Sequence, residues 1–195
     1  LEVEVIKTAG WAVIRDKTIN KEYDAAHMLS PMPIAITLGV GSNPLPYTMP
    51  AVENINGQAI TLSRALYDKG VKDGPSLKAL MTKEKREYVF AQTFPTGTHA
   101  MWLYYWMAAN NIHPFLDAKA IVVPPPQMVA NMRVGNMDGF CVGEPWGNRA
   151  IVDKINEYTK DGWELYQVTT GVQSPSEKSS QGIYMTRYLF RKGMN

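Results

Sequence analysis

The sequence is poor in cysteine and lacks any long hydrophobic run. Its 195 residues include a single cysteine, Cys141, which excludes an internal disulfide and a metal site built from several cysteines. No apolar run reaches the roughly eighteen residues that a membrane-spanning helix requires. No basic and then apolar leader precedes a small-residue cleavage site. The sequence therefore predicts a globular chain in which Cys141, within the apolar segment GFCVG, is a buried and unreactive thiol.

Charge of one sign is also scarce. Twenty Lys and Arg residues nearly balance eighteen Asp and Glu residues, and the formal net charge is +2. The basic residues are scattered and form no stripe, which argues against nucleic acid as the main partner. With 45% hydrophobic and 19% charged residues, the chain has enough apolar material for a packed core.

The signatures of common enzymes are missing. The sequence contains no G-x-S-x-G elbow, no Walker loop and no G-x-G-x-x-G fingerprint. Its histidines, His27, His99 and His113, lack the spacing of a helical metal pair, and no carboxylate cluster accompanies them. We therefore expect binding without turnover: no enzymatic activity, no catalytic residue, no metal and no cofactor.

Strands and helices alternate regularly from residue 88. Apolar segments predict strands at 88–94, 118–124 and 138–143, each followed by a helix, at 98–111, 126–135 and 145–158. Such βα units in series predict a mostly parallel sheet. Trp102, Tyr105 and Trp106 in the first of these helices have spacing suited to packing between layers.

The two ends of the chain are less regular. Towards the N-terminus we expect strands at 1–9, 24–29 and 58–63, and helices at 11–19, 32–41 and 76–86. Towards the C-terminus, two strand-like runs at 163–171 and 182–192 are separated by a polar linker, which predicts an antiparallel pair.

The turn at residues 95–99 is the strongest candidate for a binding site. It joins a predicted strand to the N-terminus of an aromatic helix, and it contains Gly97, Thr98 and His99. Ligands of open α/β sheets bind outside the carboxyl ends of the strands, and helix N-termini there favour anions. His99 can donate a ring N–H to an anion, or it can remain neutral and satisfy a loop carbonyl.

Other candidates also allow two interpretations. Trp11 can donate its indole N–H to a ligand or serve as a buried lid. Gln58 offers a neutral amide donor at the start of a strand. Pro125, within a run of three prolines, suits a rigid wall or merely ends a strand. Glu144 contacts a ligand or only stabilises the first turn of a helix.

Several segments in the same order resemble a known family. AGWAVIRDK, NGQAITLS, FPTGTHAMWLYYWMAANNI and VVPPPQMVANMRVGNMDGFCVGEPW are similar to the nitrate- and bicarbonate-binding proteins of bacterial ABC transporters, and to a related nitrate sensor. The likeness covers roughly residues 1–155. It implies an α/β fold of the type II periplasmic-binding-protein kind, a three-layer sandwich in which two lobes close over a small oxyanion.

The resemblance also implies roles for single residues. Trp11 would supply an indole donor, Gln58 an amide donor and His99 an imidazole donor, while Pro125 and Val142 would form walls of the cleft. The family places a lysine after the segment that matches GEPW. The nearest candidate here is Lys178, but the match fails around it and the role is not carried over.

The chain departs from the family at both ends. Family members usually begin with a further strand and helix, so we expect an incomplete first lobe with an exposed sheet edge. Beyond residue 155 the sequence is more similar to a small domain of a helix and two strands. We therefore expect a partial first lobe and hinge region at 1–87, a second α/β lobe at 88–155, and a divergent tail, the helix end plus a strand pair, at 156–195.

These observations lead to two functional hypotheses. In the first, the chain binds nitrate, or nitrite or bicarbonate, in an interlobe cleft for ABC-type uptake or sensing. Its partners would then be ABC transporter membrane subunits, and its compartment periplasmic or membrane-associated by family resemblance. In the second, the fold is reused as a regulatory or structural subunit without anion transport, and a protein partner covers the exposed edge.

Overall fold

The computed structural model describes residues 2–53, 57–161, 163–173 and 183–192. Its contacts separate the chain into two compact units, Leu1–Gly147 and Asn148–Asn195, which are described separately. Within the described residues, every helix is too short or too polar to cross a membrane.

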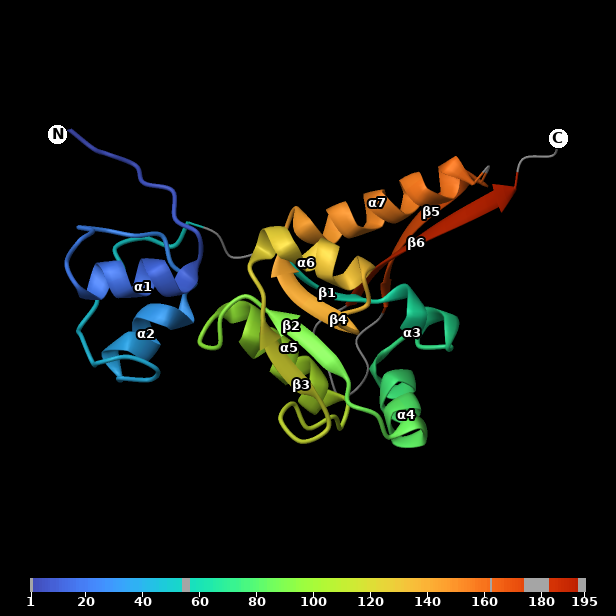
Figure 1. Ribbon diagram of the computed structural model, residues 1–195, viewed down its shortest axis with the longest axis horizontal. Coiled ribbons are helices and arrows are strands. Elements are labelled where there is room, and N and C mark those ends of the chain that lie inside the picture. Colours follow the sequence, from blue (N-terminus) through green and yellow to red (C-terminus); the bar gives the residue numbers. More distant parts are fainter. Residues whose placement is uncertain (1, 54–56, 162, 174–182, 193–195) are drawn as a thin grey trace. The chain divides into compact units, whose positions relative to one another are not determined.

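The first unit is built on a four-stranded sheet. Its strands are β1 (Gln58–Leu62), β2 (Val89–Gln92), β3 (Lys119–Val122) and β4 (Gly139–Gly143). They lie in the order β1-β4-β2-β3 (Figure 1). β2 runs parallel to both β3 and β4, whereas β1 is antiparallel to β4. The prediction of a mostly parallel sheet is confirmed.

Helices lie before, between and after these strands along the chain. In chain order they are α1 (Trp11–Ile19), α2 (Pro31–Thr37), α3 (Arg64–Asp68), α4 (Gly74–Glu84), α5 (Thr98–Ala109), α6 (Pro125–Arg133) and α7 (Trp146–Lys160). α4 begins where Asp73 and Ser76 form a capping box, which satisfies amides that the helix leaves unpaired. The five-residue α3 was not predicted, because a single turn between Ser63 and Gly70 gives too short a periodic pattern.

The core lies between the sheet and the helices α3, α4 and α5. It contains Leu66, Leu77, Tyr88, Phe90, Leu103 and Cys141, all almost fully buried. Burial raises the pKa of the Cys141 thiol to about 12, in agreement with the prediction of a buried thiol that stays protonated. Neighbouring residues of β4 alternate between faces, so Phe140 and Val142 point to the other face, towards α6.

The aromatic residues of α5 differ from expectation. The buried positions of this helix are His99, Ala100, Leu103 and Met107. Trp102 and Tyr105 are 44% and 69% exposed and pack edge to face on the surface. Trp106 alone of the three packs partly against the core. Apolar residues occur on all sides of α5, so their spacing in the sequence has no helical period. The sequence therefore could not show which face of the helix points inward.

Two predicted strands are wrong. Residues 2–9 and 24–29 form no strand in the structure, although residues 2–6 alternate between polar and apolar. Val5 is 90% exposed. A strand requires a neighbour to accept and donate its backbone hydrogen bonds, and an alternating sequence cannot supply that neighbour by itself.

The second unit contains α7 from Asn148 onwards and two long strands. β5 (Trp163–Gln173) pairs antiparallel with β6 (Ile183–Lys192), with Trp163 opposite Lys192 and Gln173 opposite Ile183. The predicted C-terminal antiparallel pair is confirmed. The linker residues 174–182, and with them Lys178, lie outside the described residues.

The expected division at residues 87 and 155 remains a prediction. In the structure β1, from the expected first segment, pairs with β4 of the second, and the contacts change at Gly147 instead.

Candidate functional site

The N-terminus of α5 lies at the carboxyl end of β2. Gly97 precedes the helix with extended backbone angles, and no side chain among the described residues caps it. The first helical acceptor, the Gly97 carbonyl, receives its hydrogen bond from Met101 N at 3.2 Å. The amides of Thr98, His99 and Ala100 therefore precede the first helical hydrogen bond, as they do in helix-terminal anion sites.

His99 lies in the first turn of this helix and is 7% exposed. Its Nδ1 is 2.8 Å from the hydroxyl oxygen of Thr93, which follows the last residue of β2. Burial lowers the pKa of His99 below its ordinary value, so the imidazole is neutral at neutral pH. Nε2, the other ring nitrogen, is directed towards β4, where a Cβ built on Gly143 would lie 3.4 Å from it.

Gln58 reaches the same position from β1. Gln58 and Gly143 are partners in the β1–β4 register, and Glu144 N donates to Gly57 O at 2.7 Å beside them. Two residues further along the strands, Ile60 opposes Cys141, and both pack against the core beneath α5. Because side chains alternate along strands, Gln58 shares this face with His99. We call Gln58, His99 and Gly143 the β1–β4 corner.

Gly143 provides the space within this corner. Any larger residue would place its Cβ 3.4 Å from both His99 Nε2 and Gly57 O. Glycine therefore leaves free, beside His99 Nε2, the space that a Cβ would occupy in ordinary van der Waals contact. The arrangement can present neutral hydrogen-bond donors to a small guest.

The other predicted residues occupy different positions around this end of the sheet. Val142 is buried on the opposite face from His99, so its side chain is not part of the corner. Pro125 is the first residue of α6 and Pro126 follows it, so this helix start lacks two amide donors and can act only as a wall. The Glu144 carboxylate lies against Gly147 near the start of α7, with Oε1 3.1 Å from the Cβ position there. This placement suits a residue of the first helical turn.

Leu29, and Arg15 of α1, lie against the turn at 95–99 and the residue before it. A Cβ on Gly97 would lie 2.5 Å from Leu29 Cδ1, so glycine permits this close packing. The Arg15 guanidinium lies 5.5 Å from the centre of the Phe94 ring. Trp11 is one turn before Arg15, and its ring contacts His27 at a centroid distance of 5.8 Å. The role of Trp11 as an anion donor remains a prediction.

Sequence reasoning missed Thr93 and Gly143. Thr93 is a polar residue at the end of a buried strand, which is a usable signal for a site residue. Nothing in the sequence marks Gly143 as a site residue, because its role depends on its position beside His99 in the folded chain.

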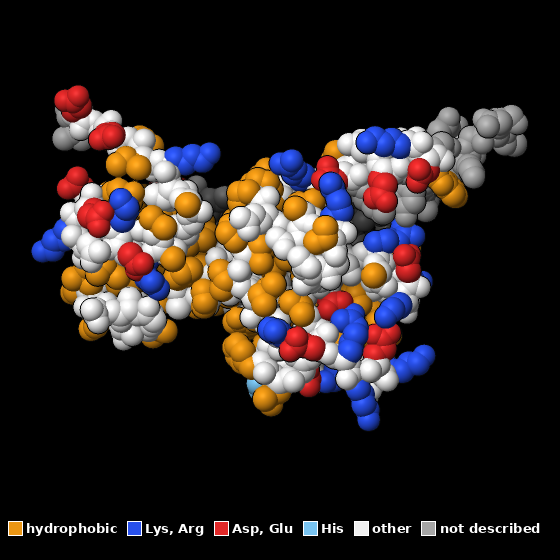
Figure 2. Space-filling model, viewed as in Figure 1, with side chains coloured by type: hydrophobic (Ala, Val, Ile, Leu, Met, Phe, Trp, Pro, Cys, Tyr) orange, Lys and Arg blue, Asp and Glu red, His pale blue; other side chains and the backbone are white. Residues whose placement is uncertain are grey.

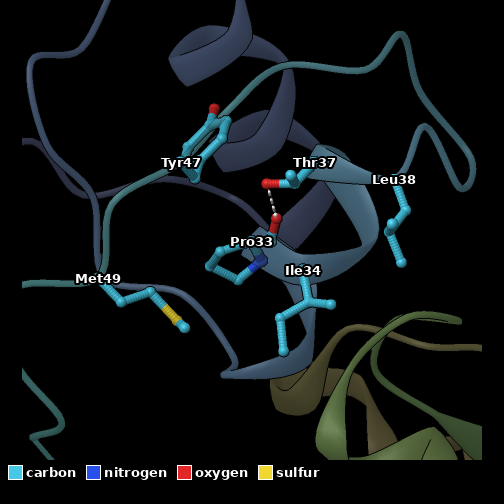
Figure 3. Close-up of a pocket in the computed structure, with 6 residues that line it drawn as sticks. All are labelled: Pro33, Ile34, Thr37, Leu38, Tyr47 and Met49. Atoms are coloured by element: carbon cyan, nitrogen blue, oxygen red, sulfur yellow. Dashed lines mark hydrogen bonds between the residues drawn. The ribbon is translucent and has the colours of Figure 1, made fainter.

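One pocket among the described residues lies away from this corner. It is an apolar cavity of about 170 Å³ on α2 and the segment after it, lined by Pro33, Ile34, Thr37, Leu38, Tyr47 and Met49 (Figure 3). The Thr37 hydroxyl already donates to Pro33 O at 2.9 Å. This lining does not suit a small anion, and it includes none of the predicted site residues.

The charged surface contains no basic stripe on the face seen in Figure 2, where Lys and Arg side chains are interspersed with Asp and Glu. Among the residues that the structure describes, no group of His, Cys, Asp and Glu is positioned to hold a metal ion. The N-terminus of α5 supplies partial positive charge near the corner.

Comparisons with known proteins agree with the fold. The chain is 44% identical to the nitrate/nitrite binding protein NrtA of Synechococcus elongatus over 85% of its own length and 40% of that protein. It is 32% identical to the bicarbonate-binding protein CmpA of the same species over 80% of the chain and 37% of that protein. The crystal structure of the periplasmic nitrate-binding protein NrtA from Synechocystis matches with a TM-score of 0.71 and 42% identity, over 78% of the chain and 41% of that structure.

These matches confirm the resemblance to nitrate- and bicarbonate-binding proteins and the periplasmic-binding-protein fold. The chain spans about 40% of the length of the curated relatives it matches. The family model described as the NMT1-like family matches residues 1–165, and the chain therefore belongs to the NMT1-like family.

Proposed function

We propose that this chain forms part of a solute-binding protein that holds a small planar oxyanion, nitrate first and nitrite or bicarbonate next. The observation that carries the proposal is the β1–β4 corner, where the buried, neutral imidazole of His99 borders Gly143 and the half-buried Gln58 lies on the same face of the sheet. This corner adjoins the N-terminus of α5, which favours negative charge. Relatives named for nitrate and bicarbonate binding support the choice of anion.

Neutral donors suit such an anion. A hydrogen bond to a charged group contributes about 1.5–3 kcal/mol, roughly twice a neutral one. Nitrate is flat and accepts hydrogen bonds in its plane, so donors placed around a gap can hold it without a buried counter-charge. Chloride lacks several oxygens to satisfy separate donors, and we expect weaker binding for it.

The complete assembly would use this binding without chemistry. Trp11 would approach the anion from the side of α1, and Pro125 would limit the cleft. Delivery to the membrane subunits of an ABC transporter, or sensing, would then take place in the periplasm or at the membrane. The curated relatives include the ATP-binding protein of a nitrate importer, which supports a role in transport.

A second role has one observation in its favour. Large apolar side chains are exposed in the N-terminal segment, among them Val5, Leu38 and Val52. A protein partner that covers them would make the chain a regulatory or structural subunit without anion transport.

Titration calorimetry with sodium nitrate, bicarbonate and chloride tests the proposal. We expect saturable heat with nitrate or bicarbonate, and an affinity about tenfold or more lower in His99→Ala, because one charge-assisted hydrogen bond is lost. His113→Ala is the matched control, since His113 is exposed and its Nδ1 accepts from Phe115 N at 3.2 Å. Absence of heat with all three salts at millimolar concentration, or equal affinities in wild type and His99→Ala, would contradict the proposal.

A further inference from the structure

Thr93 and His99 form a buried pair whose proton arrangement decides what His99 can bind. The Thr93 hydroxyl oxygen and His99 Nδ1 are 2.8 Å apart, and Thr93 is 4% and His99 7% exposed. Because burial keeps the imidazole neutral, the ring carries one N–H, on either Nδ1 or Nε2. The two tautomers present opposite groups to the β1–β4 corner.

In one tautomer Nδ1–H donates to the Thr93 oxygen, and Nε2 faces Gly143 as a bare acceptor. An acceptor lone pair would repel an anion at that position. In the other, the Thr93 hydroxyl donates to Nδ1, and Nε2–H is directed towards the space that Gly143 leaves open, 3.4 Å from its Cβ position. Only the second tautomer can donate to an oxyanion.

We propose that Thr93 is a positioning residue that holds His99 as the Nε2–H tautomer by donating its hydroxyl to Nδ1. This inference rests on the proposed function, because the corner must be the place where the anion binds. Thr93 needs no contact with the anion, since it acts through the ring. The same hydrogen bond limits rotation of the ring, so Nε2 remains aligned with the gap.

Two substitutions separate this role from simple packing. Thr93→Val keeps the shape of the side chain but removes the hydroxyl, and Thr93→Ser keeps the hydroxyl but removes a methyl group. We expect nitrate affinity to fall about tenfold in Thr93→Val and to stay near wild type in Thr93→Ser, because the hydrogen bond rather than the methyl group matters. A loss that follows the methyl group would overturn the proposal.

Nitrogen NMR of protein labelled with [15N]histidine reports the tautomer directly. We expect wild type and Thr93→Ser to show a protonated Nε2 and a bare Nδ1 at His99, and Thr93→Val to show a mixture or the reverse. The spectra of His27 and His113 should not change. A protonated Nδ1 in wild type would overturn the proposal whether or not nitrate binds.

The double substitution distinguishes failure of this inference from failure of the proposed function. In a His99→Ala background, Thr93→Val should cause no further loss of nitrate affinity, because its effect passes through the ring. If His99→Ala has no effect on binding, the proposed function fails. If His99→Ala weakens binding while Thr93→Val does not, only the role of Thr93 fails.

Discussion

The two ends of the sheet in the first unit use polar groups in opposite ways. At the amino ends of β2 and β4, charged side chains pair with one another. The Arg86 guanidinium donates to both oxygens of Asp138, and Asp138 Oδ2 also accepts from Val89 N at 2.9 Å. At the carboxyl ends, the neutral His99 imidazole borders the Cβ position of Gly143, and Gln58 lies on the same face of the sheet. The charged groups at the amino ends are bonded to one another, whereas the neutral groups at the carboxyl ends are placed to bind a ligand.

The pKa shifts of the ionisable groups also differ between the two ends of the sheet. The hydrogen bond with Asp138 raises the pKa of Arg86. A hydrogen bond from Lys69, followed by one from Tyr88, lowers the pKa of Glu84 to about 2. Burial raises the pKa of Tyr88 to about 12. These groups keep their charge states over the whole physiological range, whereas His99 at the other end is neutral through burial alone.

The difference teaches which polar groups of this protein are structural. A bidentate ion pair that also accepts a backbone amide joins β2 to β4. At the β1–β4 corner the strands are joined through their backbones, and the side chains of Gln58 and His99 are neutral. We therefore expect substitutions at the amino end to change stability, and substitutions at the carboxyl end to change anion affinity.

The largest effect is expected for Gln58→Glu. The carboxylate replaces an amide donor with a negative charge, and like charges about 4 Å apart at an effective dielectric near 20 repel by about 4 kcal/mol. Nitrate affinity in calorimetry should fall at least about a hundredfold. Gln58→Met, which removes the donor without adding charge, should fall by about tenfold. Equal losses in the two variants would place the anion away from β1.

Asp138→Ala should lower stability and leave nitrate affinity nearly unchanged. It removes the partner of Arg86 and the acceptor for Val89 N at a side chain that is only 14% exposed. We expect a loss of about 2 kcal/mol in the free energy of unfolding by urea, because a buried amide and a guanidinium lose their acceptor. Nitrate affinity should remain within about twofold of wild type. A large loss of affinity would show that the two ends are coupled.

The smallest effect concerns pH. The folded pKa of His99 lies below its ordinary value of 6.5, so between these values the unfolded chain binds more protons than the folded one. The contribution of His99 to stability is therefore intact above pH 6.5 and decreases as the pH falls towards the folded pKa. His99→Gln should flatten the dependence of the unfolding free energy on pH in this range. Identical slopes in wild type and His99→Gln would contradict the burial of a neutral ring.

The sequence contained enough to predict the main elements of the sheet and the start of α5. Strands β2, β3 and β4 and their following helices have strong local patterns, and the turn at 95–99 combines glycine with a helix start. The strand predicted at 1–9 failed because a strand depends on a neighbour that local alternation does not reveal. For the same reason the absence of β structure there could not be read from the sequence.

The corner itself was only partly predictable. Gln58 and His99 were identified as separate donors, but their proximity follows from the pairing of Gln58 with Gly143, residues far apart in the chain. The partnership of Thr93 with Nδ1 follows from the packing of α5 on β2. Neither relationship has a period or spacing that a single sequence displays.

Nitrate titration of Gly143→Ala tests most directly whether the β1–β4 corner holds the anion. The added methyl group would lie 3.4 Å from His99 Nε2, and it fills the gap without removing any donor. We expect wild type to bind nitrate and Gly143→Ala to lose at least about tenfold in affinity while it unfolds within about 1 kcal/mol of wild type. Gly135→Ala, where nothing lies within 4 Å of the Cβ, controls for a glycine change alone, and its positive φ is expected to affect stability only. Equal nitrate isotherms for wild type and Gly143→Ala would contradict an anion site at this corner.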